Sequence, residues 1–423
     1  MTVPLNQTGK LHAGAARINI TPTEPVPLAG FYARQTLFDG VHDDIYARAA
    51  VFESGGIAAV LVAVDTCVLP DCFCDDVIAR ISRECSIPTS SIILNASHTH
   101  SGPALYVPRG SKTLNAFWLD DHPWEVPLKR YTEWLKECIV SVVGEAQQNL
   151  APARIGFGKG ESSIGINRRE SDNDGHIRIG ENPDGIVDRE LSVVRIDSYD
   201  GETVAVLFNL GVHGTCMMTD QITGDWCGLA AWRIERGMSN DTVALYLSGT
   251  AGDVNPVGSV RKTFGSPGGD ADTAAVLVAE KTMAVAGTII THDSGEVRAE
   301  HRIVSVPGKP YRGLIGYDPA YEPLMNELSP VQDTQVRTSM IAVGDIVFVG
   351  CSGEMFSEIG RDIKSGSPYP ITIVMGLCNG YSSYILPGHE ADRGGYEYNA
   401  SVIAGDGGET VVENMIDLIN TDN

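Results

Sequence analysis

Hydrophobic and polar positions along the chain form two recurring patterns. Short, nearly continuous apolar runs of strand length end at polar residues or glycine, as at residues 58–64, 92–94 and 204–210. Such runs are typical of strands that are buried on both faces. Other segments carry apolar residues at helical spacing, as at residues 128–150 and 271–288. The pattern therefore predicts a mixed α/β fold with β-sheets packed inside and helices outside, and we expect one domain over residues 1–423.

One predicted strand ends in two histidines. Residues 92–103 read I-I-L-N-A-S-H-T-H-S-G-P, so the apolar run stops at His98 and His100 before a Gly-Pro turn. Residues at i and i+2 of an extended segment point to the same face. Both rings would face one cavity if the strand continues through them. The alternative is a pair of strand-end histidines that only satisfy local hydrogen bonds, and a single H-x-H pattern does not decide between the two.

Two further predicted strands lead to metal-binding residue types. The run at 204–210 leads to G-V-H-G-T, which contains His213, and the run at 347–349 leads to G-C-S-G-E, where Glu354 is predicted to open a helix. Two or three histidines with a carboxylate are the usual composition of a catalytic zinc site. Such a metal lowers the pKa of its water and polarises a carbonyl group. Because spacing does not prove that distant segments meet, a metal hydrolase is one hypothesis and structural histidines are the other.

Two segments lack a clear period and are predicted to be loops. Residues 104–126 are aromatic and proline-rich, which favours a long ordered loop beside the histidines, a candidate lid or substrate wall. Residues 165–169, G-I-N-R-R, lie in a polar, glycine-rich stretch that continues to residue 182. We expect these two loops to determine which substrate is accepted.

Composition narrows the class of protein. Of the 423 residues, 43% are hydrophobic and 20% charged, which indicates a folded globular chain. The net charge of -23 argues against binding to nucleic acid or anionic membranes, so we expect a small-molecule substrate. Nine scattered cysteines and an N-terminus without an apolar core favour a cytoplasmic protein with reduced thiols. No apolar stretch has the length for stable membrane insertion, and the oligomeric state is not indicated.

Several ordered motifs resemble one known family. They are A-R-I-N-I-T-P at 16–22, N-A-S-H-T-H-S-G-P at 95–103, I-N-R at 166–168, V-H-G-T at 212–215, T-G-D at 223–225, G-D-V-N-P at 252–256, G-E at 353–354, N-G-Y-S-S-Y-I at 379–385 and Y-E at 396–397. In this order the motifs resemble the N-terminal catalytic domain of the neutral/alkaline non-lysosomal ceramidases.

The resemblance implies a zinc hydrolase site. The zinc ligands would be His98, His213, Glu354 and Tyr384. His100 would lie beside the metal as an acid or base, and Arg168 and Tyr396 would face the substrate carbonyl as donors to a developing oxyanion. Without the resemblance, the residue types favour a surface ion-pair partner for Arg168 and a core aromatic residue with a solvated hydroxyl for Tyr396.

The chain departs from the family pattern in two respects. Asn255 occupies the position at which ceramidases carry a serine, and we expect no C-terminal β-sandwich domain. A water-based mechanism needs no serine, whereas a covalent acyl-enzyme route does. The sequence thus predicts a zinc-dependent hydrolase of a linear amide, ceramide-like or smaller. The alternatives are a metal-dependent esterase, lactonase or deacetylase, or a non-catalytic protein that binds zinc or another ligand.

Overall fold

The computed structural model describes residues 10–31, 34, 36–108, 123–239, 241–260, 269–312 and 333–421. Most of the predicted loop at 104–126 lies outside these residues. At its end, however, the chain is already helical from Glu125, because Glu125–Gln148 form α2. The helix predicted to start near residue 128 therefore begins earlier than its apolar periodicity indicates.

The largest sheet has eight strands in the order β12-β10-β9-β6-β1-β3-β4-β5. In chain order these strands are β1 (His12–Asn19), β3 (Tyr46–Ser54), β4 (Ile57–Val64), β5 (Ile92–Ala96), β6 (Ala151–Glu161), β9 (Glu190–Ser198), β10 (Thr203–Leu210) and β12 (Val243–Ser248). Most neighbours are antiparallel, but β4 pairs with β5 and β10 with β12 in parallel.

A second sheet has four strands in the order β14-β15-β16-β18. They are β14 (Val297–Val306), β15 (Thr334–Val343), β16 (Ile346–Cys351) and β18 (Ile371–Met375). Smaller sheets are formed by β13 (Val254–Pro256) with β7 (Gly165–Ser171) and β8 (Ile177–Asn182), by β2 (Gly40–Val41) with β11 (Gln221–Ile222), and by β17 (Glu354–Met355) with β19 (Tyr384–Ile385).

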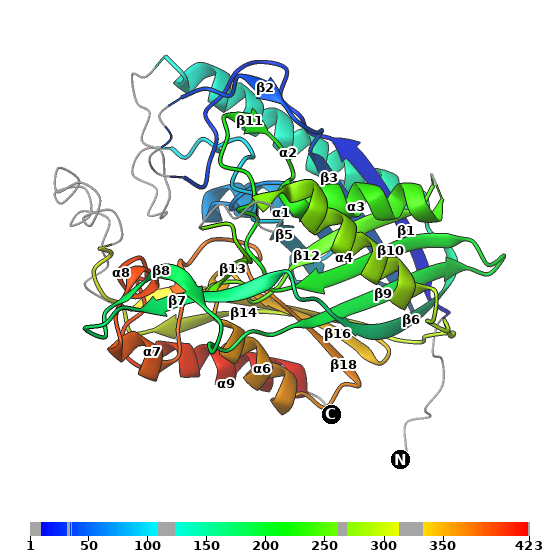
Figure 1. Ribbon diagram of the computed structural model, residues 1–423. Helices are drawn as coiled ribbons and strands as arrows, with labels where there is room; N and C mark the ends of the chain where they lie inside the picture. The colour runs from blue at the N-terminus through cyan, green and yellow to red at the C-terminus, as the bar shows by residue number, and fades with distance from the viewer. Residues whose placement is uncertain are drawn as a thin grey trace.

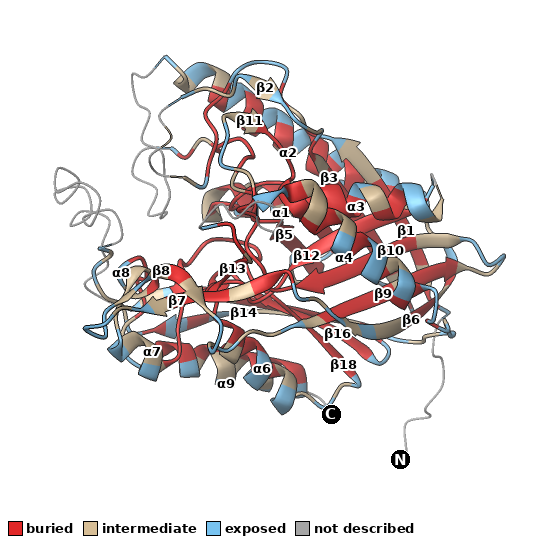
Figure 2. Cartoon of the chain, viewed as in Figure 1, coloured by how far each residue is buried: buried red, intermediate tan, exposed pale blue. Residues whose placement is uncertain are grey.

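The two large sheets pack against each other through one apolar core. Leu61 of β4 and Leu245 of β12 belong to the same buried cluster as Ile341 and Phe348 of the four-stranded sheet. Phe348 also stacks on Phe52 of β3, with ring centroids 6.3 Å apart. Because side chains alternate along a strand, Val60 and Val62, on either side of Leu61 in β4, face the opposite side of the sheet. Strands buried on both faces result, as their continuous apolar runs predict (Figure 2).

Helices cover the outer faces of both sheets (Figure 1). Against the eight-stranded sheet lie α1 (Asp71–Cys85) and α2 in one apolar cluster, and α3 (Asp225–Met238) and α4 (Ala271–Ala286) in another. Against the four-stranded sheet lie α6 (Ser357–Gly366) and α9 (Gly407–Asn420). The predicted arrangement of sheets inside and helices outside is confirmed. Among the described residues, no helix combines the length and apolarity that crossing a membrane requires.

The expected loop at residues 165–182 is in fact a β-hairpin. Its strands β7 and β8 pair antiparallel, and β7 also pairs with β13, so that Asn167 lies opposite Val254. The polar, glycine-rich composition concealed these strands because they belong to a small sheet and lack a continuous apolar run. The hairpin thereby fixes Arg168, which a loop would leave free to move.

Candidate functional site

His98 reaches the site from a turn rather than from a strand. Strand β5 ends at Ala96, and His98 has a backbone φ of 64°, in the left-handed region. The condition that the strand continues through both histidines is therefore not met. The rings of His98 and His100 nevertheless lie together, with centroids 4.8 Å apart, because the turn brings them to one side.

The loop after β10 brings His213 to the same place. Residues Thr99 and Gly214 form a β-bridge, and the His100 amide donates to the Gly214 carbonyl. On the other side, the indole of Trp226 at the start of α3 donates to the His213 carbonyl at 2.9 Å. Gly214 permits this close approach, since a Cβ at this position would lie 2.8 Å from the His98 carbonyl oxygen.

Glu354 lies on a short strand and not at the start of a helix. It belongs to β17, and the following helix α6 begins at Ser357, which corrects the prediction for Glu354. The parallel pairing of β17 with β19 places Glu354 directly opposite Tyr384. Two predicted metal ligands that are thirty residues apart in sequence are thus brought together by backbone pairing.

His98, His213 and Glu354 form one buried cluster of potential ligands. Glu354 Oε2 lies 3.2 Å from Nε2 of His98 and 3.2 Å from Nε2 of His213. The three side chains are at most 5% exposed. Each offers one ligand atom, and these atoms all lie within 4.8 Å of one another. A metal ion could therefore contact all three at once.

Hydrogen bonds orient both rings for this purpose. His98 Nδ1 lies 2.8 Å from the Cys67 carbonyl oxygen, and His213 Nδ1 lies 2.7 Å from the Ala251 carbonyl oxygen. A carbonyl oxygen can only accept a hydrogen bond, so each Nδ1 carries a hydrogen and each Nε2 faces the cluster centre. Burial, together with the charge of Arg168, lowers the pKa of His213 to about 4. This ring is therefore neutral, as metal ligation requires.

The donor set fits a zinc ion. Among the described residues, Glu354 Oε2 is buried without a hydrogen-bond partner, an arrangement that costs free energy unless a cation completes it. The other oxygen, Oε1, accepts a hydrogen bond of 2.7 Å from the hydroxyl of Tyr381. Burial disfavours the charged carboxylate, but the charge of the adjacent His98 outweighs this effect and holds the pKa of Glu354 well below its usual range. Imidazole nitrogens with one carboxylate oxygen are typical zinc ligands.

Arg168 lies at the edge of the cluster, and each of its side-chain nitrogens has a hydrogen-bond partner. Its Nε donates to Glu397, its Nη1 donates to Asn255 Oδ1 at 3.3 Å, and its Nη2 donates to the Tyr384 hydroxyl at 3.1 Å. Nη1 also lies 3.1 Å from His213 Nε2. The guanidinium is 4% exposed, so it is not the surface ion-pair partner that the residue type alone allows.

The other predicted site residues lie around Arg168 and the cluster. His100 Nε2 is 3.4 Å from His98 Nε2. Asn255, on β13, is buried. Tyr396 begins the short helix α8 (Tyr396–Asn399), is partly exposed, and its ring centroid lies 5.8 Å from that of Tyr384. The structure thus brings every predicted site residue into one region.

Comparison with known proteins decides the family. The family model described as neutral/alkaline non-lysosomal ceramidase, N-terminal, matches residues 12–285. The chain belongs to this ceramidase family. His98, His100, Arg168, His213 and Asn255 fall within the match, whereas Glu354, Tyr384 and Tyr396 follow it.

The ceramidase relatives are distant in sequence. Neutral ceramidase A of Dictyostelium discoideum is 26% identical over 272 residues, which cover 60% of this chain and 37% of the relative. Neutral ceramidase of Pseudomonas aeruginosa is 24% identical over 257 residues, which cover 57% of this chain and 36% of the relative. The matched part thus spans well under half of each relative.

Solved ceramidase structures share the fold over almost the whole chain. A ceramidase complexed with C2 aligns with a TM-score of 0.78 at 19% identity, covering 96% of this chain and 74% of that one. The crystal structure of the Pseudomonas aeruginosa neutral ceramidase aligns with a TM-score of 0.76 at 19% identity, covering 96% and 73%. The ceramidase-like fold predicted from the motifs is confirmed.

Sequence reasoning about this ceramidase relative missed three buried residues that contact the site. Tyr381 and Glu397 belong to the quoted motifs, but nothing in the sequence pattern indicates that they contact the site. Arg169 follows the I-N-R motif, and it was placed in a loop. All three became visible only through their hydrogen bonds to Glu354 and around Arg168.

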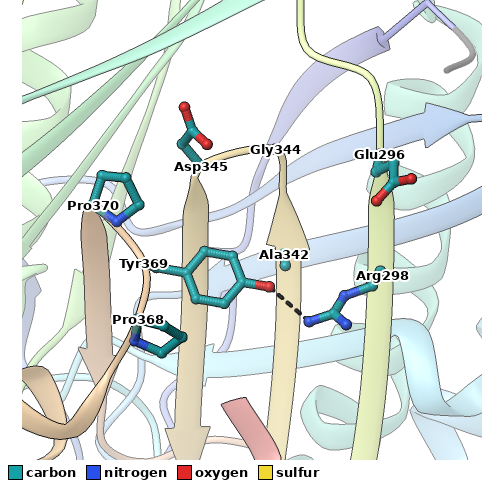
Figure 3. A pocket seen from close by; sticks show the side chains of 8 residues that line it. All are labelled: Glu296, Arg298, Ala342, Gly344, Asp345, Pro368, Tyr369 and Pro370. Carbon is teal, nitrogen blue, oxygen red and sulfur yellow. Dashed lines mark hydrogen bonds between the residues drawn. The ribbon is translucent and has the colours of Figure 1, made fainter. Parts of the chain in front are cut away.

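A cavity of about 310 Å³ lies elsewhere, at the turn between β15 and β16 (Figure 3). There the Arg298 guanidinium donates to the Tyr369 hydroxyl at 2.7 Å, beside Glu296 and Asp345. Because this turn precedes β16 whereas Glu354 follows that strand, the cavity is at the other end of the strand from the cluster of His98, His213 and Glu354. It contains none of the predicted site residues.

Proposed function

We propose that this protein is a zinc-dependent hydrolase that cleaves the linear amide bond of an N-acyl compound with water. The observation that carries the proposal is the buried cluster of His98, His213 and Glu354, with its unpartnered carboxylate oxygen, in a chain of the ceramidase family. Tyr384 is the proposed fourth ligand, because the β17–β19 pairing places it opposite Glu354. A bound zinc ion would supply Lewis acidity and an activated water at this position.

The surrounding residues have complementary roles in the proposed reaction. Water adds to the amide carbon, and the carbonyl oxygen becomes an oxyanion to which Arg168 and Tyr396 donate hydrogen bonds. His100 takes a proton from the water and delivers it to the nitrogen of the leaving amine as the C–N bond breaks. The products are a carboxylic acid and an amine, so atoms and charges balance without a further reactant.

Asn255 has a positioning role in this proposal. Its Oδ1 accepts from Arg168 Nη1, so the amide helps to orient the guanidinium that receives the developing charge. An asparagine supplies no hydroxyl for an acyl-enzyme, which favours direct attack by water. A positioned arginine and a neutral amide suit any carbonyl substrate, so esters have to be tested beside amides.

The proposed substrate is a small N-acyl molecule, ceramide-like or shorter. The names of the relatives support a ceramide-like compound, and the charge of -23 supports a small molecule over nucleic acid. All nine cysteines lie in described segments, and none of them is in a disulfide. This supports a reducing compartment, and we propose the cytoplasm.

Metal content per chain tests the proposal first. Elemental analysis should find about one zinc per wild-type chain and little in the His213→Ala variant. His301→Ala is the matched control, because His301 is half-buried on β14 and bonds Ser339, outside the cluster. Zinc-loaded enzyme should then hydrolyse N-acyl amides in a series of chain lengths.

Two results would contradict the proposal. A folded wild type that takes up no zinc would mean that the histidines are structural. If the protein takes up zinc and hydrolyses matched esters but no amides, the function is that of an esterase and not of an amidase.

A further inference from the structure

Residues 388–399 carry Tyr396 to the site, yet they bury little apolar surface. Helix α7 (Gly388–Asp392), which is described throughout, has no buried residue, and the one buried residue of α8 is Glu397. Tyr396 and Tyr398 are partly buried against the small cluster around Phe356. The hydrophobic effect therefore contributes little to the position of this segment.

Few contacts tie the two ends of the segment to the rest of the chain: His389 Nε2 lies 3.3 Å from Glu358 Oε2, the Lys309 ammonium lies over the Tyr398 ring, and each end has a hydrogen bond. The Gly388 amide donates to Glu409 Oε1 at 2.7 Å, and the Arg312 amide donates to the Asn399 carbonyl at 2.7 Å. Between these ends the chain turns through Gly394 and Gly395, both with positive φ. The middle of the segment needs another anchor.

Arg169 provides this anchor with all of its side-chain nitrogens. Nε donates to Glu390 Oε2 at 2.8 Å and Nη1 donates to Glu397 Oε2 at 2.7 Å. Nη2 donates to the carbonyls of Glu390 and Gly394, at 3.2 and 2.8 Å. The Arg169 side chain is 2% exposed, so these bonds are shielded from water and screened little by salt.

The carboxylate of Glu397 connects Arg169 to the site. Glu397 accepts from Arg169 on Oε2 and from Arg168 on Oε1, both at 2.7 Å. Consecutive strand residues normally face opposite sides of a sheet. The register of β7 with β8 shifts between Asn167 and Arg169, and this irregularity lets both guanidinium groups reach one side chain.

We propose that Arg169 is a positioning residue of the hydrolase, which fixes Tyr396 and, through Glu397, orients Arg168 toward the reacting carbonyl. The inference rests on the proposed function for its catalytic consequence, but the anchoring itself does not. A side chain on Gly395 would meet Arg169 Nη1 at 3.1 Å and Ile177 at 2.9 Å, so the segment fits closely over the arginine.

Hydrogen exchange read by mass spectrometry tests the anchoring in the full chain. In Arg169→Met, amides of residues 388–399 should exchange at least about 10-fold faster, while β16 and α6 keep their protection. Arg178→Met is the matched control, because Arg178 pairs with Glu170 on the same hairpin and its side chain is 62% exposed. Equal exchange in the two variants, or a rise spread evenly over the whole chain, would overturn the proposal.

Kinetics test the positioning. With zinc content unchanged, Arg169→Met should lower kcat by about 10–100-fold and change KM less, because the groups that stabilise the transition state lose their alignment. A local rise in exchange with unchanged kcat would overturn the positioning role. A wild type without turnover would refute the proposed hydrolase instead, and the exchange comparison would still decide the anchoring.

Arg169→Met removes one partner from each of two carboxylates, although Glu397 keeps Arg168 and Glu390 keeps Arg393. A milder variant is therefore needed in case Arg169→Met does not fold. Glu390→Gln keeps Arg169 and its bond to Glu397 and removes one charge at a side chain that is 17% exposed. It should raise the exchange of residues 388–399 by a smaller factor than Arg169→Met. Unchanged exchange in Glu390→Gln would refute the anchor.

Discussion

Removal of the Tyr381 hydroxyl is the most specific test of zinc binding by His98, His213 and Glu354. Tyr381 is buried and donates to Glu354 Oε1 at 2.7 Å, which leaves Oε2 for the two histidine nitrogens. Tyr381→Phe would remove this donor and leave a buried carboxylate oxygen without a partner. The carboxylate could then rotate away from the geometry that the cluster requires.

The expected effect is a loss of zinc affinity. Removing a partner of a metal ligand typically weakens binding about 10–100-fold. This corresponds to about 1.4–2.8 kcal/mol, within the range for a hydrogen bond to a charged group. The zinc dissociation constant, measured by competition with a chromogenic chelator, should rise by that factor in Tyr381→Phe.

Tyr131→Phe is the matched control. Its hydroxyl is also buried and donates to the Ile20 carbonyl at 3.0 Å, but Tyr131 belongs to α2 and lies outside the cluster. It should lose stability while its zinc affinity stays at the wild-type value. If Tyr381→Phe binds zinc as tightly as Tyr131→Phe does, the hydroxyl does not orient Glu354 and the reasoning fails.

Three further predictions address separate groups. His100→Ala should keep most of the zinc and lose turnover, measured by metal analysis beside a rate assay; normal turnover would remove the proton-transfer role. Asn255→Ala should slow hydrolysis by about 10-fold without abolishing it, since Arg168 keeps its other partners; complete loss with zinc retained would make Asn255 a primary catalytic group. Burial opposes ionisation of Glu190, but Lys364 and Lys159 outweigh it and lower its pKa to about 2. Its charge therefore stabilises the fold above the ordinary pKa, and this contribution is lost as the pH falls from about 4.5 toward 2. Urea unfolding should show a weaker acid dependence in Glu190→Gln, and an identical dependence would contradict this.

The predictions that failed share a physical cause. The pattern predicts that Glu354 opens a helix and that residues 165–182 form a loop, but Glu354 lies in the two-residue strand β17 and residues 165–182 form the hairpin of β7 and β8. A two-residue strand has no periodicity of its own, and the polar strands β7 and β8 have no continuous apolar run, because pairing with other parts of the fold stabilises them. The roles of Tyr381 and Glu397 could not be predicted either, because their hydrogen-bond partners are far away in the sequence.

The sequence by itself determined the buried strands, the outer helices and the identity of the proposed ligands. Apolar runs and helical spacing are local signals, and the motifs named His98, His213, Glu354 and Tyr384 without any coordinates. Only the tertiary structure decided that these residues meet, because strand pairing and hydrogen bonds between loops bring together segments that are hundreds of residues apart. The parallel pairing of Glu354 with Tyr384, and the one carboxylate of Glu397 shared by two arginines, exist only once the chain is folded.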